Sequence, residues 1–144
     1  MDHQRILRLF FSLFLGSWLV VACSGVPSSM DQKDLKNALM RERNMLADMY
    51  ADDHFPPHLV DQCKAVLVGM CHRIETEDPK DLEGLYAITH EATERLNALQ
   101  AVFEEHGSEL ETGAREALGE EFMMIAEAYG FDADVEEMIA PREW

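Results

Sequence analysis

The apolar stripe between residues 82 and 103 constrains the fold more than any other feature of this chain. Its members recur three or four positions apart without a break: Leu82, Leu85, Thr89, Ala92, Leu96, Leu99 and Phe103. This spacing puts them on one face of an α-helix, whereas a strand would expose every second residue to the same side. The pattern is typical of a helix in a bundle, which needs partner helices with similar stripes.

Three other segments supply such stripes. The first helix is expected at about 31–50, with Leu35, Leu39, Leu46, Met49 and Tyr50 on its core side. The second is expected at about 57–77, opening at Pro57, with Leu59, Cys63, Leu67, Met70 and Ile74 in its stripe. The fourth carries Leu110, Ala114, Leu118, Phe122, Ile125 and Tyr129. We therefore predict an all-α fold over residues 31–144: an antiparallel four-helix bundle.

Turn residues predict where these helices begin and end. Asp78 and Pro79 are expected to cap and open the third helix, and Gly107 to close it. The Ser-x-x-Glu sequence at 108–111 has the form of a capping box for the fourth, which Gly130 ends. A short C-terminal helix is expected at about 133–140, and the final PREW should pack against one end of the bundle.

The N-terminal residues have the layout of a signal peptide. Arg5 and Arg8 precede the uncharged run LFFSLFLGSWLVVA at 9–22, which is short for a membrane-spanning helix. Val20 to Cys23 resemble the lipobox of bacterial lipoproteins, in which the cysteine is acylated and the preceding segment is removed. We therefore expect a lipoprotein signal peptide at 1–22, lipidation at Cys23 and a tether at 23–30.

The residue after Cys23 bears on where the protein resides. Ser24 stands where an Asp would retain a lipoprotein in the inner membrane, so the resemblance implies an outer-membrane lipoprotein that faces the periplasm. Two other interpretations stay open: an uncleaved anchor helix, or a misplaced start ahead of a cytoplasmic protein.

Charge separates the classes of partner. Residues 24–144 carry 27 acidic and ten basic residues, a formal charge of −17. Such a surface repels nucleic-acid phosphates and anionic lipid. It favours a basic protein partner, or it serves only to keep the protein in solution. We therefore expect no nucleic-acid partner.

The two cysteines of the second helix are eight residues apart, about 12 Å along a helix axis. A disulfide needs Cα atoms within about 7 Å, so Cys63 and Cys71 are expected to be buried, unpaired thiols. Such thiols are more common in a reducing cytoplasm, which weakens the export interpretation.

Candidate metal ligands are few. His90 and Glu94 lie one turn apart, but the stripe register places them on the outward side, and Pro56 and Pro57 break the helix geometry between His54 and His58. In GFDADVEE at 130–137, Glu137 stands where a calcium loop needs Gly, so helix capping by Asp132 is preferred. We expect no metal and no cofactor, and keep His54, His58, His90 and Glu94 as weak candidates.

Signals of catalysis are absent from the sequence. After residue 29 the only serine is Ser108, which the capping box employs, and no glycine-rich phosphate loop is present. The carboxylates are numerous but dispersed. The sequence therefore favours a protein that is not an enzyme.

Three blocks together carry a family resemblance: MYADDHFPPHLVDQCK at 49–64, DLEGLYAITHEATERLN at 81–97 and AEAYGFDADVEEMIAPREW at 126–144. They resemble a small bacterial family classed only as a domain of unknown function, over about Met45 to Trp144. The resemblance implies no catalytic or binding residues. Members of that family usually start near the first helix, so residues 1–30 depart from its pattern.

These observations favour a non-enzymatic acidic helical protein, tethered by lipid to the bacterial envelope, that binds another protein. An inhibitor or immunity protein for a basic effector is the sharper form of this hypothesis. The alternatives are a small cytoplasmic helical protein with a misplaced start, and a metal-dependent enzyme whose site is assembled across helices.

Overall fold

The computed structural model describes residues 30–144, so the predicted signal peptide, the lipidated Cys23 and most of the tether lie outside the described residues. Within residues 30–144 every regular element is a helix. In chain order these are η1 (Gln32–Asp34), α1 (Ala38–Glu42), α2 (Ala47–Ala51), α3 (Pro57–Glu77), α4 (Leu82–Glu105), α5 (Thr112–Ala128) and α6 (Val135–Met138). The predicted all-α class and the helical bundle are confirmed.

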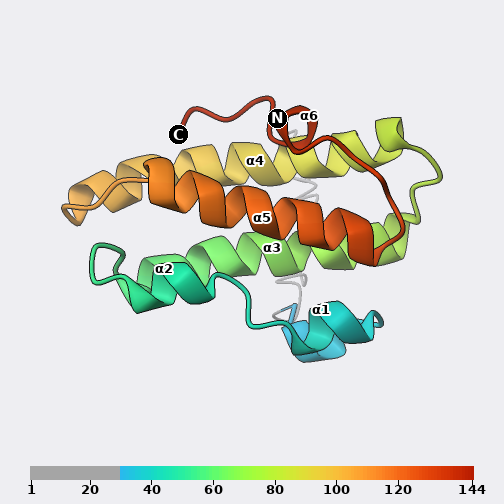
Figure 1. The fold of residues 1–144 in the computed structure, drawn as a ribbon, viewed down its shortest axis with the longest axis horizontal. Helices are drawn as coiled ribbons and strands as arrows, with labels where there is room; N and C mark the ends of the chain where they lie inside the picture. The colour runs from blue at the N-terminus through green and yellow to red at the C-terminus, as the bar shows by residue number, and fades with distance from the viewer. Residues whose placement is uncertain (1–29) are drawn as a thin grey trace, which may run out of the picture.

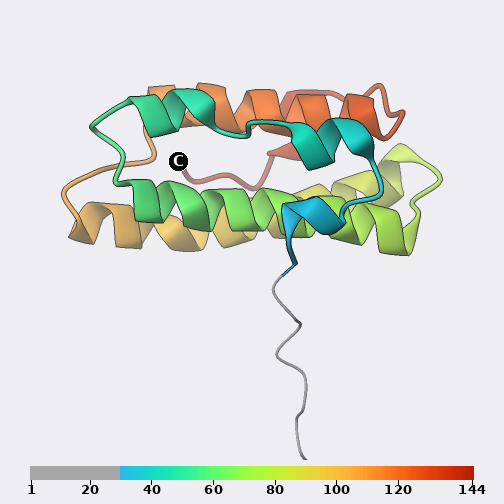
Figure 2. The ribbon, with the colours of Figure 1, turned by 90° about the horizontal axis from the view of Figure 1, so that it is seen from below.

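Helices α3 and α4 form one layer, and α5 lies with α1 and α2 in a second layer across from them (Figures 1 and 2). The short helix α6 and the C-terminal tail cover α4 beside α5. The core between the layers contains Phe103 and Phe122, neither of which is exposed. The two layers therefore share a single apolar core.

The stripe that predicted α4 is buried with two exceptions. Five of its seven members are core residues: Leu85, Thr89, Ala92, Leu96 and Phe103. Leu82, at the start of the helix, is 38% exposed, and Leu99 is half-buried. The regular spacing thus predicted the buried face of this helix correctly over most of its length.

The predicted helix at 31–50 is wrong, because the chain there forms three short helices. Asn37 caps α1 by accepting hydrogen bonds from the N–H groups of Leu39 and Met40. Leu46 has a φ of 58°, in the left-handed region, and starts α2. Leu39, which was expected in the core, is 69% exposed because these breaks rotate α1 away from the predicted register.

Two of the predicted helix starts are also wrong. Asp78 ends α3 in a left-handed conformation, and it is Asp81 that caps α4 by accepting from the Gly84 N–H at 2.9 Å. Helix α5 begins at Thr112 without a side-chain cap, and the Ser108 hydroxyl is buried with no hydrogen-bond partner among residues 30–144. The predicted capping box at 108–111 therefore does not form.

The predicted glycine stops are confirmed. Gly107 has a φ of 73° and Gly130 a φ of 85°. After each, the next residue's N–H reaches back to the carbonyl five residues earlier, from Ser108 to Phe103 and from Phe131 to Ala126 at 2.9 Å. This is the hydrogen-bond pattern of a Schellman motif, which ends a helix at a left-handed residue.

The C-terminal PREW lies along α4 rather than against one end of the bundle. Asn97 donates to the Pro141 carbonyl at 2.9 Å and accepts from the Glu143 N–H at 3.0 Å. Arg142 is ion-paired with Glu136 at 2.9 Å, and Trp144 is half-buried against the core. The tail is thus held by Asn97 of α4, by the ion pair with Glu136 and by the packing of Trp144.

Candidate functional site

The histidines singled out from the sequence lie in two separate places. His58, at the start of α3, has its ring 5.1 Å from that of His106, which follows α4. His54 lies beside them in the preceding loop, 3.6 Å from the carboxylate of Glu111. Together these residues lie at one end of the bundle.

His90 is remote from that end. It precedes His106 by 16 residues of helix α4 and its C-cap, a separation of about 24 Å along the axis. Its ring stacks on Tyr86 with centroids 6.1 Å apart, and its Nε2 lies 2.7 Å from the Glu137 carbonyl of α6. The hypothesis of a site assembled from His54, His58 and His90 therefore does not fit the fold.

Glu94 does not join His90 in a ligand pair either. It is exposed and accepts a hydrogen bond from Asn97 at 3.1 Å. Among residues 30–144, no group of three or more His, Cys, Asp and Glu side chains is arranged to hold a metal ion.

The acidic cluster after Gly130 serves helix capping, but through a different residue from the one expected. Asp134, rather than Asp132, caps α6 by accepting from the Glu136 N–H at 2.8 Å. Glu136 in turn lies 3.3 Å from Arg115 and 2.9 Å from Arg142. This cluster ties α5, α6 and the tail together.

Cys63 and Cys71 are both unpaired and fully buried, as the sequence predicted. Burial raises the pKa of each thiol to about 12, because it removes water from the thiolate. A thiol with such a pKa is almost entirely protonated near pH 7 and is a poor nucleophile.

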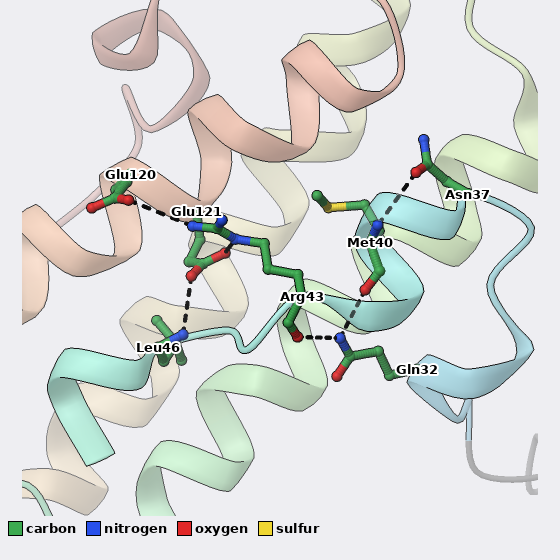
Figure 3. Close-up of polar contacts among 7 residues, drawn as sticks. All are labelled: Gln32, Asn37, Met40, Arg43, Leu46, Glu120 and Glu121. Atoms are coloured by element: carbon green, nitrogen blue, oxygen red, sulfur yellow. Dashed lines mark hydrogen bonds and ion pairs between the residues drawn. The ribbon is translucent and has the colours of Figure 1, made fainter. Parts of the chain in front are cut away.

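A buried carboxylate that sequence analysis missed holds the break between α1 and α2. Glu121 of α5 is 4% exposed and accepts hydrogen bonds from the Arg43 Nε at 2.6 Å and from the Leu46 N–H at 3.0 Å (Figure 3). The hydrogen bond from Arg43 to Glu121 and the charge of that carboxylate raise the pKa of Arg43. The pair compensates a left-handed Leu46, a conformation that costs about 1–2 kcal/mol in a residue with a Cβ.

A signal for Glu121 was present in the sequence. It lies three residues after Leu118 and four before Ile125, so it falls on the same buried face as those two side chains. A carboxylate in an apolar stripe needs a partner, because a buried unpaired charge is strongly unfavourable. The sequence did not show that this partner would be Arg43.

A second carboxylate, Glu75 of α3, holds the loop between η1 and α1. It accepts from the N–H groups of Lys36 and Asn37, both at 2.9 Å, and from the Tyr129 hydroxyl at 2.7 Å. Burial acts to raise the pKa of Glu75, but these hydrogen bonds to the carboxylate outweigh it and the pKa is lowered. Burial and the bond to Glu75 raise the pKa of Tyr129.

Two open clefts of about 590 and 710 Å³ lie along α5 and adjoin at Met124. We call the residues that line them the acidic face: Ala38, Leu39, Met40, Glu42, Arg43, Asn44, Thr112, Arg115, Glu116, Gly119, Glu120, Met123, Met124, Glu127, Ala128, Val135, Glu136 and Ile139. Met123 is 40% exposed and Leu39 69% exposed. Methionine adapts its shape to different apolar partners, so these side chains suit a binding surface.

Carboxylates surround this apolar strip. Five glutamates line the two clefts: Glu42, Glu116, Glu120, Glu127 and Glu136. The two arginines there are already neutralised, since Arg115 pairs with Glu136, and Arg43 with Glu120 and Glu121. The acidic face therefore presents apolar anchors within a negative field.

Comparison with known proteins identifies a family but no characterised relative. Residues 39–144 match the model of a family of unknown function (DUF5713). No curated protein and no solved structure matches the chain. The match spans all three sequence blocks on which the resemblance to an uncharacterised family rested.

Proposed function

Since this chain belongs to the DUF5713 family of unknown function, we propose its function from its own surface: it is a non-enzymatic binding protein whose acidic face captures a basic protein. The observation that carries the proposal is the placement of exposed Leu39 and Met123 among five cleft-lining glutamates. Apolar anchors supply contact area, and the surrounding charge raises the association rate of a partner of opposite sign. An inhibitor or immunity protein that covers a basic effector would work in this way.

The second part of the proposal is that acylation of Cys23 tethers the protein to the bacterial envelope, with outer-membrane sorting implied by Ser24. Support comes from the sequence alone: an uncharged run behind two arginines, a lipobox-like ending and a polar tether. No helix within residues 30–144 is long and apolar enough to cross a bilayer. Attachment would then depend on the lipid at Cys23.

Binding is tested with two charge-reversal variants of the full chain. Glu116→Lys/Glu127→Lys alters the two clefts at exposed side chains that form no ion pair or hydrogen bond among residues 30–144. Glu105→Lys/Glu109→Lys makes the same change of charge at exposed positions outside the acidic face. Each protein is cross-linked in a bacterial host, and the partner identified is then purified for kinetic measurements.

We expect the cleft variant to bind the partner at least tenfold more weakly and the control variant to bind within about twofold of wild type. The association rate of the wild type should fall as salt rises from 0.05 to 0.5 M, since charge steering is screened within about 8 Å at physiological ionic strength. An acidic partner, or equal loss in both variants, would contradict the proposed face.

Acylation is tested separately by growing the host with a labelled fatty acid. The wild type should incorporate label and fractionate with membranes, and the Cys23→Ala variant should do neither in mature form. A soluble wild-type protein whose N-terminal peptide begins at or after Met30 would instead support the misplaced start.

A further inference from the structure

The basic residues of this chain are divided between those that are neutralised and those that are not. Of the ten Lys and Arg residues after Cys23, five form ion pairs: Arg43, Arg73, Lys80, Arg115 and Arg142. The other five have no ion-pair partner among residues 30–144: Lys33, Lys36, Arg41, Lys64 and Arg95. All but Lys36 lie together on one surface.

That surface consists of two clefts of about 600 and 370 Å³ that share Met30 and Ala65. We call their lining residues the basic face: Met30, Asp31, Gln32, Lys33, Arg41, Arg43, Asp61, Gln62, Lys64, Ala65, Val66, Val68, Arg95, Ala98 and Leu99. It holds five basic residues and two acidic ones in a chain whose remaining surface is strongly acidic.

Both acidic residues of the basic face are already engaged. Asp31 caps η1 by accepting from the Lys33 N–H at 2.9 Å, and Asp61 accepts from the Tyr50 hydroxyl at 2.5 Å. Apolar groups complete the surface, since Met30 is 45% exposed and Val66 and Leu99 are half-buried. A surface that combines free cations with exposed apolar side chains suits the headgroup region of an anionic bilayer.

The position of this face relative to Cys23 is the second observation. The described chain begins at Met30, on the α3–α4 side of the bundle, with α5 in the other layer (Figure 2). Seven peptide units join Cys23 to Met30, and seven units can span at most about 25 Å. Helix α4 alone, with 24 residues, is about 36 Å long. A lipid at Cys23 therefore keeps the basic face close to the membrane.

We infer that the basic face lies on an anionic phospholipid surface and that the acidic face is thereby presented to partners on the opposite side. This inference rests on the acylation of Cys23 proposed above. The same negative surface that attracts Lys33, Lys64 and Arg95 repels the glutamates along α5, so both effects favour one orientation. The acyl chain and the basic patch then act as two membrane signals, which together hold a protein more firmly than either alone.

The orientation is tested on the full chain, expressed in a bacterial host and reconstituted into vesicles. A fluorescent probe is attached at Ala98→Cys, on the basic face, or at Glu116→Cys, on the acidic face. Cys63 and Cys71 have no exposed surface and do not compete for the label, and Cys23 is blocked when it is acylated. A quencher carried on the lipid then reports how close each probe lies to the bilayer.

In vesicles containing phosphatidylglycerol we expect the Ala98 probe to be quenched at least twofold more than the Glu116 probe. The difference should disappear in phosphatidylcholine vesicles and in high salt, because both remove the attraction between the face and the surface. Equal quenching of the two probes on anionic vesicles would overturn the inference.

Single charge reversals distinguish the effect of charge on the basic face from the effect of the overall charge of the protein. Lys64→Glu and Arg95→Glu should each reduce the quenching of the Ala98 probe, whereas Lys80→Glu, outside the clefts, should leave it unchanged. Equal effects at all three positions would also overturn the inference.

Three outcomes identify what fails. If Cys23 carries no fatty acid, both the tether and this inference are wrong; if it is acylated and the probes are quenched equally, the inference alone is wrong. If a probe at Ala98 on one copy and a probe at Glu116 on another quench each other, the basic face binds the acidic face of a second copy and does not lie on lipid.

Discussion

The acidic and basic faces of this bundle differ in how their minority charges are used. On the acidic face both arginines are ion-paired, and on the basic face both aspartates accept hydrogen bonds from the protein itself. In each case the minority charge serves the fold. The majority charges that form no ion pair among residues 30–144 are Glu42, Glu116 and Glu127 on the acidic face and Lys33, Arg41, Lys64 and Arg95 on the basic face. The formal charge of −17 is therefore an average over two surfaces of opposite character, the acidic face and the basic face.

Arg43 lines a cleft on each face, so its ion pair with Glu121 joins them. Replacing Glu121 with Leu should have the largest effect on stability, because it leaves Arg43 and the Leu46 N–H without their buried partner. We expect the free energy of unfolding to fall by about 3 kcal/mol, measured by urea denaturation.

Glu120→Gln is the matched control, because Glu120 is 59% exposed and lies 3.5 Å from the same arginine. It should change stability by less than about 1 kcal/mol. Equal losses of stability in the two variants would show that the buried Glu121 stabilises the fold no more than the exposed Glu120 does.

Removing residues 141–144 should have the next largest effect. The deletion exposes the apolar surface under Trp144 and removes one of the two arginines that pair with Glu136, so the free energy of unfolding should fall. We expect a loss of about 1–3 kcal/mol by thermal or chemical unfolding. An unchanged melting temperature would indicate that the tail serves binding instead of folding.

Glu75→Gln tests how strongly this carboxylate stabilises the loop between η1 and α1. The substitution keeps an acceptor but removes the charge that three donors share, so we expect a loss of about 1–2 kcal/mol at pH 7. The pKa of Glu75 is lowered in the folded protein, so its contribution is fully present above the unfolded pKa of about 4.3 and is lost as pH falls through the folded value.

Urea denaturation of both proteins from pH 7 to pH 3 measures this dependence. The difference between wild type and Glu75→Gln should be constant near neutral pH and shrink below about pH 4.3. A difference that grows in acid would mean that the carboxylate opposes folding.

Leu39→Ser should have the smallest effect on stability, since this side chain is 69% exposed on the acidic face. We expect a change within about 0.5 kcal/mol, whereas Met40→Ser, at a neighbour that is 2% exposed, should cost at least about 2 kcal/mol. Thermal melts of the two variants decide whether Leu39 belongs to a binding surface. A large loss at Leu39 would place it in the folding core.

Elements with local signals could be predicted from the amino-acid sequence. The 3–4 spacing and Pro57 placed α3 at Pro57–Glu77, and Gly107 and Gly130 marked helix ends because a left-handed residue needs no distant contact. It also indicated that Cys63 and Cys71 would be buried. The spacing of apolar residues is recognised within a few helical turns, so it predicts a helix without knowledge of the rest of the fold.

The breaks in the predicted first helix and the two faces depend on contacts between residues far apart in the sequence. The break at Leu46 is held by Glu121, 75 residues further along the chain, and the loop before α1 by Glu75, 38 and 39 residues away. The unpaired cations of the basic face come from positions 33, 41, 64 and 95, which no local window contains. Hydrogen bonds and charges act across space, so helix packing determined which carboxylate held which loop and which cations remained unpaired.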